Sequence, residues 1–129
     1  DGIGWQGHLM NNQGLKQFVE SLDEELKKLS DLIDWAHSNK LEFHITELDY
    51  YNDGENNAFN SVKKQAEVYQ KLMNLLQEKS KNGLVTVNFW SMGERKSSRG
   101  LKGHYMSLYD NDTIPTKTYQ VVKNFINFN

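Results

Sequence analysis

Three short apolar runs alternate with amphipathic helical patterns, and this alternation constrains the fold more than any other feature of the sequence. The runs cover residues 2–9, 41–49 and 84–90, and the third, LVTVNFW, is dense in β-branched and aromatic residues. Strands that alternate with helices form parallel sheets with right-handed crossovers. The sequence therefore predicts an α/β protein in which three parallel strands are each followed by a helix or a loop.

Between these runs, apolar residues recur every three or four positions, as they do on one face of a helix. The capping-box spacing of Ser21 and Glu24 predicts the start of a helix that ends near residue 38. A second helix is expected from about residue 60 to 78, and Pro115 can open a last one. Residues 91–103 are expected to form a loop, and 105–109 a short extended piece. The residues expected to face inward are Leu22, Leu26, Leu29, Ile33 and Ala36, then Val62, Ala66, Tyr69, Met73 and Leu76, then Tyr119, Val122 and Ile126.

The composition of the chain limits the classes of function that it can have. The 129 residues fit one modest domain, and the absence of cysteine excludes disulfides and thiolate metal sites. The near-balance of 15 basic and 17 acidic side chains argues against a nucleic-acid partner. No apolar run approaches the roughly 20 residues that span a bilayer, so no membrane association is predicted. The chain starts at Asp1 without a signal-peptide pattern, and we expect it to be a piece of a longer protein.

Three strands are few for a parallel sheet, which normally has both faces covered and few free edges. Three strands alone leave two edges with unpaired backbone groups. We therefore expect the chain to form part of a larger sheet or closed barrel and, in isolation, to self-associate through bare edges. The alternative is a small, self-sufficient α/β domain.

Residues 2–7 match the pattern GxGxxG, which in a dinucleotide site lies between a strand and a helix. Here no strand can precede it and an asparagine-rich loop follows it. The nucleotide interpretation is rejected, and no cofactor is predicted.

Two carboxylates, Glu47 and Asp49, close the second strand, at the end where parallel barrels build their chemistry. Residues two apart on a strand share a face, and His8 ends the first strand at the same level. An imidazole between two carboxylates can orient one of them and tune its charge. The alternative is a solvated carboxylate pair and a surface histidine. The spacing of His8, His44 and Glu47 matches no zinc motif, so no metal is predicted, and His44 is expected to pack or to hydrogen-bond.

Aromatic residues offer a second candidate feature, because aromatic faces stack on sugar rings. Trp90 ends the third strand and is either such a platform or a core residue. Trp5 and Trp35 are expected to be packing residues. The basic run at 95–102 is interpreted as a solvated loop.

Four segments together point to one family: DGIGWQGHL at 1–9, EFHITELDYY at 42–51, VNFWSMGER at 87–95 and SLYDNDTIPTKTY at 107–119. In order and approximate spacing they resemble glycoside hydrolase family ten, the endo-β-1,4-xylanases. The resemblance implies a (β/α)₈ barrel of which residues 1–129 form the C-terminal part, with strands six to eight. By family analogy the parent protein is expected to be secreted or cell-surface.

The resemblance also implies roles for individual residues. Glu47 would be the nucleophile of a retaining reaction on xylan or xylo-oligosaccharides. His8 would hydrogen-bond Glu47, with Asp49 supporting His8, while Gln6 and Trp90 would contact the sugar next to the cleaved bond. The family's acid/base glutamate lies on the fourth strand, outside this chain. We therefore expect the isolated chain to be inactive and to need the missing N-terminal half of the barrel as its partner.

The chain departs from the family pattern after Trp90. Ser91 stands where the family usually has glycine, Glu94 is the candidate for its acidic residue, and Arg99 lies near the place of a second tryptophan. Two other interpretations stay open. One is a non-catalytic carbohydrate-binding or structural module derived from the barrel. The other is a regulatory α/β domain, which would need a phosphoacceptor at the end of its first strand, whereas Asp49 ends the second.

Overall fold

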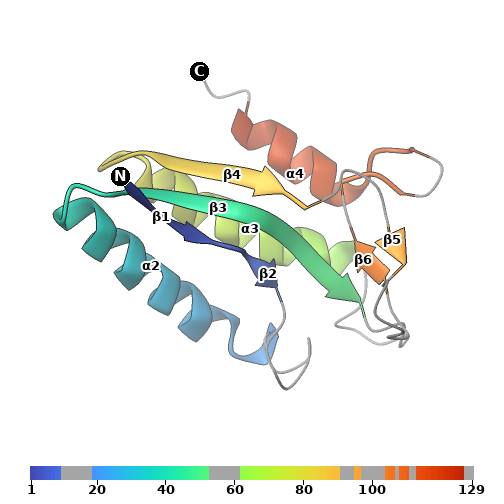
Figure 1. The fold of residues 1–129 in the computed structure, drawn as a ribbon. Coiled ribbons are helices and arrows are strands. Elements are labelled where there is room, and N and C mark those ends of the chain that lie inside the picture. Colours follow the sequence, from blue (N-terminus) through green and yellow to red (C-terminus); the bar gives the residue numbers. More distant parts are fainter. Residues whose placement is uncertain are drawn as a thin grey trace.

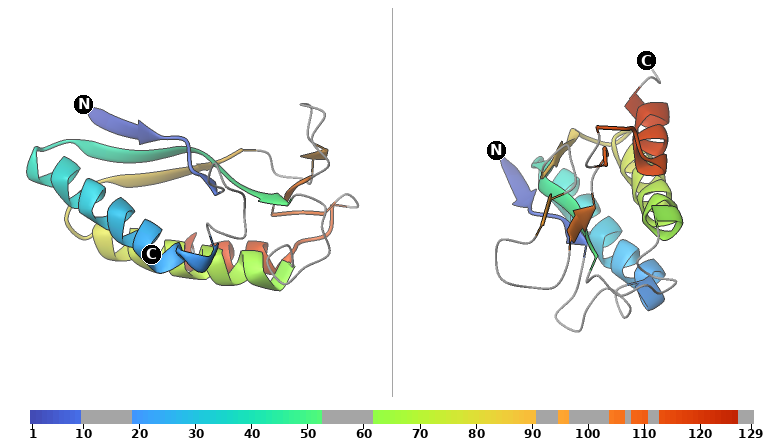
Figure 2. Two further views of the ribbon diagram at one scale, coloured as in Figure 1. Left: turned by 90° about the horizontal axis from the view of Figure 1, so that it is seen from below. Right: turned by 90° about the vertical axis from the view of Figure 1, so that its right-hand side faces the viewer.

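The structure is a computed structural model that describes residues 1–9, 19–52, 62–90, 95–96, 104–106, 108–110 and 113–126. In this part of the chain, helices pack against one face of a sheet and leave the opposite face uncovered (Figures 1 and 2). The strands are β1 (Gly2–Trp5), β2 (His8–Leu9), β3 (Glu42–Asn52), β4 (Val85–Phe89), β5 (Arg95–Lys96) and β6 (His104–Met106), and the helices are α2 (Leu22–Ser38), α3 (Val62–Lys79) and α4 (Lys117–Ile126).

Strand β3 lies at the centre of the sheet. Strands β1 and β2 pair with it in parallel on one side, and β4 pairs with it in parallel on the other. The predicted parallel α/β arrangement is confirmed. The prediction of one continuous first strand is wrong, because Gly7 has a φ of 79° and separates β1 from β2. Residues 95–96, predicted to lie in a loop, form β5, which pairs antiparallel with β6, and β6 pairs antiparallel with the end of β3.

A bulge in β3 decides which way its side chains point. Ile45 pairs with Val87 and Leu48 with Phe89, so β3 has one residue more than β4 between these two pairs. Before the bulge, Phe43 and Ile45 are fully buried on the helix side. Strict alternation would place residue 47 on that same side. The extra residue shifts the alternation, so that Leu48 becomes the buried residue and Glu47 is released toward the other face.

The core lies between the sheet and the helices. The predicted inward stripe of α2 is confirmed, since Leu22, Leu29, Ile33 and Ala36 are buried and Leu26 packs partly buried against them. In α3 the buried face is broader than predicted and includes Gln65, Val68 and Leu72. Val122 of α4 is buried, but Ile126 is 67% exposed, contrary to prediction.

The tryptophan predictions are partly confirmed. Trp5 packs against the core, as expected. Trp35 does not, because 55% of its surface is exposed on the outside of α2. The expectation that Trp35 packs is wrong, because it lies beside the buried stripe of α2 rather than within it.

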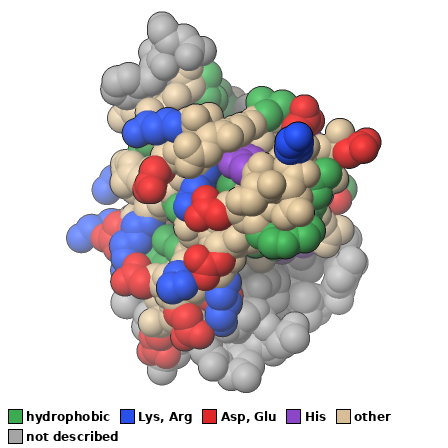
Figure 3. All heavy atoms as spheres, turned by 90° about the vertical axis from the view of Figure 1, so that its left-hand side faces the viewer, with side chains coloured by type: hydrophobic (Ala, Val, Ile, Leu, Met, Phe, Trp, Pro, Cys, Tyr) green, Lys and Arg blue, Asp and Glu red, His purple; other side chains and the backbone are tan. Residues whose placement is uncertain are grey.

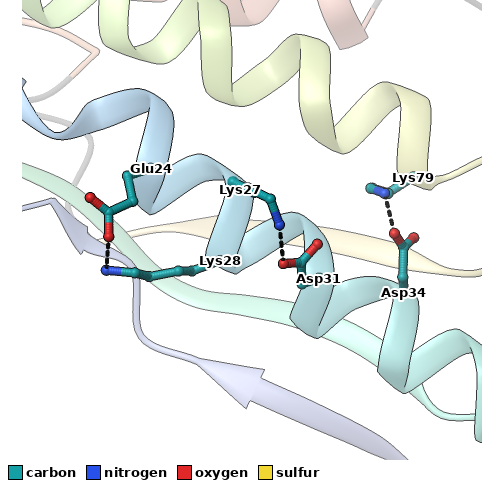
Figure 4. Close-up of polar contacts among 6 residues, drawn as sticks. All are labelled: Glu24, Lys27, Lys28, Asp31, Asp34 and Lys79. Carbon is teal, nitrogen blue, oxygen red and sulfur yellow. Dashed lines mark hydrogen bonds and ion pairs between the residues drawn. The ribbon is translucent and has the colours of Figure 1, made fainter.

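Ion pairs form within α2 and between α2 and α3 (Figure 4). Lys79 Nζ lies 2.6 Å from Asp34 Oδ2, and Lys79 is buried between the helices, so this pair fixes their relative position. Lys27 and Asp31 form an exposed pair within α2. Ser21 occupies the N-cap position but makes no side-chain capping hydrogen bond, so the predicted capping box is wrong.

Acidic and basic side chains are interspersed over the end of the molecule where β1 begins, without a large region of one sign (Figure 3). Within the described residues, no helix is long and apolar enough to cross a membrane.

Candidate active site

The strand register brings three predicted residues together where the parallel strands end. His8 of β2 lies directly opposite Asp49 of β3, and the bulge turns Glu47 toward the same imidazole. His8 Nδ1 is 2.8 Å from Asp49 Oδ1. His8 Nε2 is 3.6 Å from Glu47 Oε2, which is close enough for electrostatic contact and longer than a hydrogen bond. The imidazole thus lies between the two carboxylates and is bonded to Asp49 as expected, but the expected hydrogen bond from His8 to Glu47 is not formed.

Burial gives the two carboxylates different surroundings. The Asp49 side chain is only 3% exposed, whereas those of His8 and Glu47 are 35% and 27% exposed. An ionised carboxylate accepts hydrogen bonds and cannot donate them, so the hydrogen between His8 and Asp49 belongs to Nδ1. A hydrogen bond from Nε2 to Glu47 would need a proton on that nitrogen as well, because a carboxylate oxygen can only accept. Asp49 therefore fixes the orientation of His8 through Nδ1, while Glu47 keeps access to solvent.

The helix side of the site is aromatic. Tyr69 of α3 is fully buried, and burial raises its pKa well above the ordinary value, with a further contribution from the negative charge of Asp49. Burial likewise raises the pKa of Tyr50. Both phenols therefore stay neutral at neutral pH, and Tyr69 is the one on which the charge of Asp49 acts.

The backbone just before His8 is hydrogen-bonded to β3, and Gly7 provides the conformation that this pairing needs. The Glu47 amide donates to the carbonyl oxygen of Gln6 at 2.9 Å, and the Asp49 amide to that of Gly7 at 3.4 Å. The positive φ of Gly7 favours glycine, and a Cβ added there would lie 2.7 Å from Ile45 Cγ2. Gly7 is therefore needed to bring His8 into register with Asp49.

We expect Gly7→Ala to lower the free energy of unfolding by roughly 1–3 kcal/mol, because it combines a left-handed backbone with a steric clash. Gly4→Ala is the matched control, since Gly4 has an ordinary backbone conformation and its added Cβ would lie 3.4 Å from Thr46 Cγ2, an acceptable contact. Urea unfolding of both variants measures the difference. Equal stabilities would contradict the role given to Gly7.

The two predicted sugar-contact residues lie at the same end of the sheet. Gln6 is exposed between β1 and β2. Trp90 follows β4 directly, is 41% exposed, and its amide donates to the carbonyl oxygen of Leu48 at 3.0 Å. Trp90 is thus not a core residue, and its backbone is tied to the bulge that presents Glu47. Ser91, Glu94 and Arg99, where the sequence departs from the family pattern, lie outside the described residues.

A second polar cluster, which the sequence analysis missed, lies nearer the start of the strands. His44 Nδ1 is 2.8 Å from Thr86 Oγ1, and His44 Nε2 is 3.2 Å from Glu42 Oε2. The prediction that His44 hydrogen-bonds is confirmed. Its partners were detectable from strand alternation, which places residues 42 and 44 on one face. The described residues contain no cluster of three or more His, Asp or Glu side chains arranged to hold a metal ion.

The geometry can be compared with known proteins. The family model for glycosyl hydrolase family 10 matches residues 1–125. The chain belongs to glycosyl hydrolase family 10. No curated protein sequence matches it closely enough to add to this assignment.

Solved family-10 xylanase structures share the fold. Xylanase 10B from Thermotoga maritima is 27% identical with a TM-score of 0.62, and the match covers 98% of this chain and 36% of that one. Xylanase 10B from Thermotoga petrophila, solved in complex with xylobiose, is 25% identical with a TM-score of 0.63 and the same coverage of 98% and 36%. An endo-1,4-beta-xylanase from Caldicellulosiruptor owensensis is 20% identical with a TM-score of 0.73, covering 99% and 39%. The chain thus spans little more than a third of these xylanases.

Proposed function

We propose that this chain is the C-terminal, nucleophile-bearing segment of a retaining endo-β-1,4-xylanase. The observation that carries the proposal is the arrangement of His8, held by buried Asp49 and facing Glu47 where the parallel strands end. His8, oriented by Asp49, places its Nε2 beside the Glu47 carboxylate, and a carboxylate is the group that a retaining reaction uses as its nucleophile. Family membership and the xylanase structures that share the fold support xylan as the substrate.

In the proposed reaction, a Glu47 oxygen attacks the anomeric carbon of the sugar as the glycosidic bond breaks, and a glycosyl ester forms. The leaving oxygen takes a proton from a second carboxylic acid. Water, deprotonated by that same group, then cleaves the ester and restores Glu47. His8 acts as a positioning residue, and Asp49 keeps its Nδ1 protonated. Gln6 and Trp90 would contact the sugar bound at Glu47.

We place the second carboxyl group outside this chain, since the carboxylate that lies beside Glu47 among the described residues is Asp49. A retaining site needs its two carboxyl groups about 5–5.5 Å apart, with the second one open to the leaving group. Asp49 is the neighbouring carboxylate, but it is buried and bonded to His8. The proposed partner is therefore the N-terminal portion of the barrel, which would bring the acid/base glutamate; the present chain covers only 36% and 39% of two solved xylanases.

We expect the isolated chain to release no reducing sugar from xylan. In a chimera that we call the joined barrel, residues 1–129 replace the matching segment of Thermotoga maritima xylanase 10B and follow its preceding strands. The joined barrel is expected to hydrolyse xylan. Turnover by the isolated chain would contradict the assignment of the missing acid. A folded joined barrel that binds xylo-oligosaccharides without hydrolysing them would instead favour a non-catalytic carbohydrate-binding module.

A further inference from the structure

Asn88 of β4 lies on the same face of the sheet as Glu47. Its two neighbours, Val87 and Phe89, belong to the helix side, because both line a groove against α3 and α4. Phe89 also stacks on Tyr69 of α3, with ring centroids 6.3 Å apart. Side chains alternate along a strand, so the exposed Asn88 points to the face that the helices leave uncovered (Figure 1).

The bulge in β3 places Asn88 beside Glu47. In the register between the two strands, Asn88 is the single β4 residue that lies opposite residues 46–47. The Trp90 amide donates to the carbonyl oxygen of Leu48, the residue after Glu47, at 3.0 Å. This hydrogen bond holds β4 against β3 at the bulge and keeps Asn88 at the level of Glu47.

Thr46, the other residue of the bulge, is directed toward β1. Its hydroxyl donates to the carbonyl oxygen of Trp5 at 3.4 Å. Its Cγ2 lies close to Gly4, where an added Cβ would be 3.4 Å away. Of the two residues opposite Asn88, Glu47 is therefore the one whose side chain can meet the Asn88 amide.

The neighbouring pair on this face shows how close such side chains come. His44 pairs with Thr86, two residues before Asn88, and His44 Nδ1 is 2.8 Å from Thr86 Oγ1. Adjacent strands are only about 4.8 Å apart, so side chains that face each other on one side of a sheet can hydrogen-bond. The Asn88 amide, one step further along the same ladder, is within similar reach of Glu47.

The Glu47 carboxylate has room for a second donor. Its Oε2 lies 3.6 Å from His8 Nε2, a contact that comes from the β2 side and is longer than a hydrogen bond. Asn88 approaches from the β4 side, and its amide carries two N–H groups at every pH. Catalytic hydrogen bonds are often long before substrate binds and shorten in the complex.

We propose that Asn88 is a positioning residue: its side-chain amide donates a hydrogen bond to the Glu47 carboxylate as the sugar binds, from the side opposite His8. The inference rests on the proposed role of Glu47 as nucleophile. The amide holds one carboxylate oxygen so that the other points at the anomeric carbon. After the attack it stays bonded to the carbonyl oxygen of the glycosyl ester, and Asn88 itself gains and loses no proton.

Two variants that keep the branched shape of asparagine test this inference in the joined barrel. The substrate is an aryl xylobioside whose leaving group departs without a proton, so that kcat/KM reports on attack by Glu47. Asn88→Leu cannot donate and is expected to lower kcat/KM about 10- to 100-fold, the size of one hydrogen bond to a charged group. Asn88→Asp is expected to lower it further at neutral pH, because a second carboxylate repels the first.

The pH dependence separates positioning from a structural role. A protonated aspartic acid donates an O–H. The activity of Asn88→Asp relative to the unaltered joined barrel is therefore expected to rise as the pH falls from about 7 to about 5, whereas the relative activity of Asn88→Leu stays constant. Thr86→Val is the matched control on the same face of β4; Thr86 contacts His44, so this variant is expected to keep most of the activity.

The isolated chain gives a second readout that needs no activity. In its ¹H–¹⁵N spectrum, the side-chain amide resonances of Asn88 are expected to shift as acid protonates Glu47, and Glu47→Gln is expected to remove this shift. Resonances that do not respond to Glu47 would overturn the inference.

Unchanged kcat/KM in Asn88→Leu, with Glu47→Gln inactive, would also overturn the inference and leave the proposed function standing. So would equal losses in Asn88→Leu and Asn88→Asp that do not vary with pH, since these would show a structural role. Hydrolysis by Glu47→Gln would instead overturn the proposed function, and the role of Asn88 with it.

Discussion

Replacing Glu47 with glutamine in the joined barrel is expected to reduce xylan hydrolysis on the order of 10⁴-fold or more, as loss of a covalent nucleophile does in other enzymes. Glutamine has nearly the same shape but carries no charge and cannot form the glycosyl ester. The Glu47 side chain is 27% exposed and makes no short contact with His8, so the fold should tolerate the change. Initial rates on xylan, with circular dichroism as a folding check, measure the effect.

Glu42→Gln is the matched control on the same strand. Glu42 contacts His44 near the start of β3, far along the strand from His8, so this variant is expected to keep most of the activity. Glu47→Ala adds a chemical signature, because azide can enter the space left by the carboxylate. Azide should restore turnover of an activated xyloside and give a glycosyl azide of inverted configuration. A Glu47→Gln protein that hydrolyses xylan at the original rate would refute the assignment.

Phe43→Ala is expected to have the largest effect on stability, lowering the free energy of unfolding by about 3–5 kcal/mol. Phe43 is fully buried at the centre of the sheet, between Ile3 of β1 and Val85 of β4. Because domains of this size are stable by only about 5–15 kcal/mol, the variant should be partly unfolded under mild conditions.

Leu84→Ala serves as the comparison, because Leu84 is 53% exposed just before β4 and should change stability little. Urea unfolding monitored by circular dichroism compares the two variants. Similar midpoints for both would show that β3 is not the packing centre of the chain.

Much of this architecture was predictable because local pattern and tertiary packing agree. The spacing of Leu22, Leu29, Ile33 and Ala36 specified the buried face of α2, and those residues are buried. The order of strands and helices specified a parallel sheet. The end of β3 was recognisable as a candidate site because two carboxylates close an apolar strand, and His8 has the expected register.

Other features depend on contacts that the sequence does not encode locally. The bulge between Ile45 and Leu48 is visible only from the pairing with β4, yet it determines that Glu47 avoids the helix side. Periodicity assigned Ile126 to the inner face of its helix and could not show that this side chain would be 67% exposed. Strand β5 forms because β6 pairs with the end of β3, which short-range pattern could not indicate.

The central claim is that Glu47 forms a covalent bond to the sugar, and trapping tests it most directly. A 2-deoxy-2-fluoro-xylobioside with a good leaving group should accumulate as the glycosyl ester, because fluorine slows hydrolysis of the ester while the leaving group speeds its formation. Mass spectrometry of the digested joined barrel is predicted to find the adduct on Glu47. An adduct on a different carboxylate, or complete turnover with inverted product and no adduct, would contradict the account.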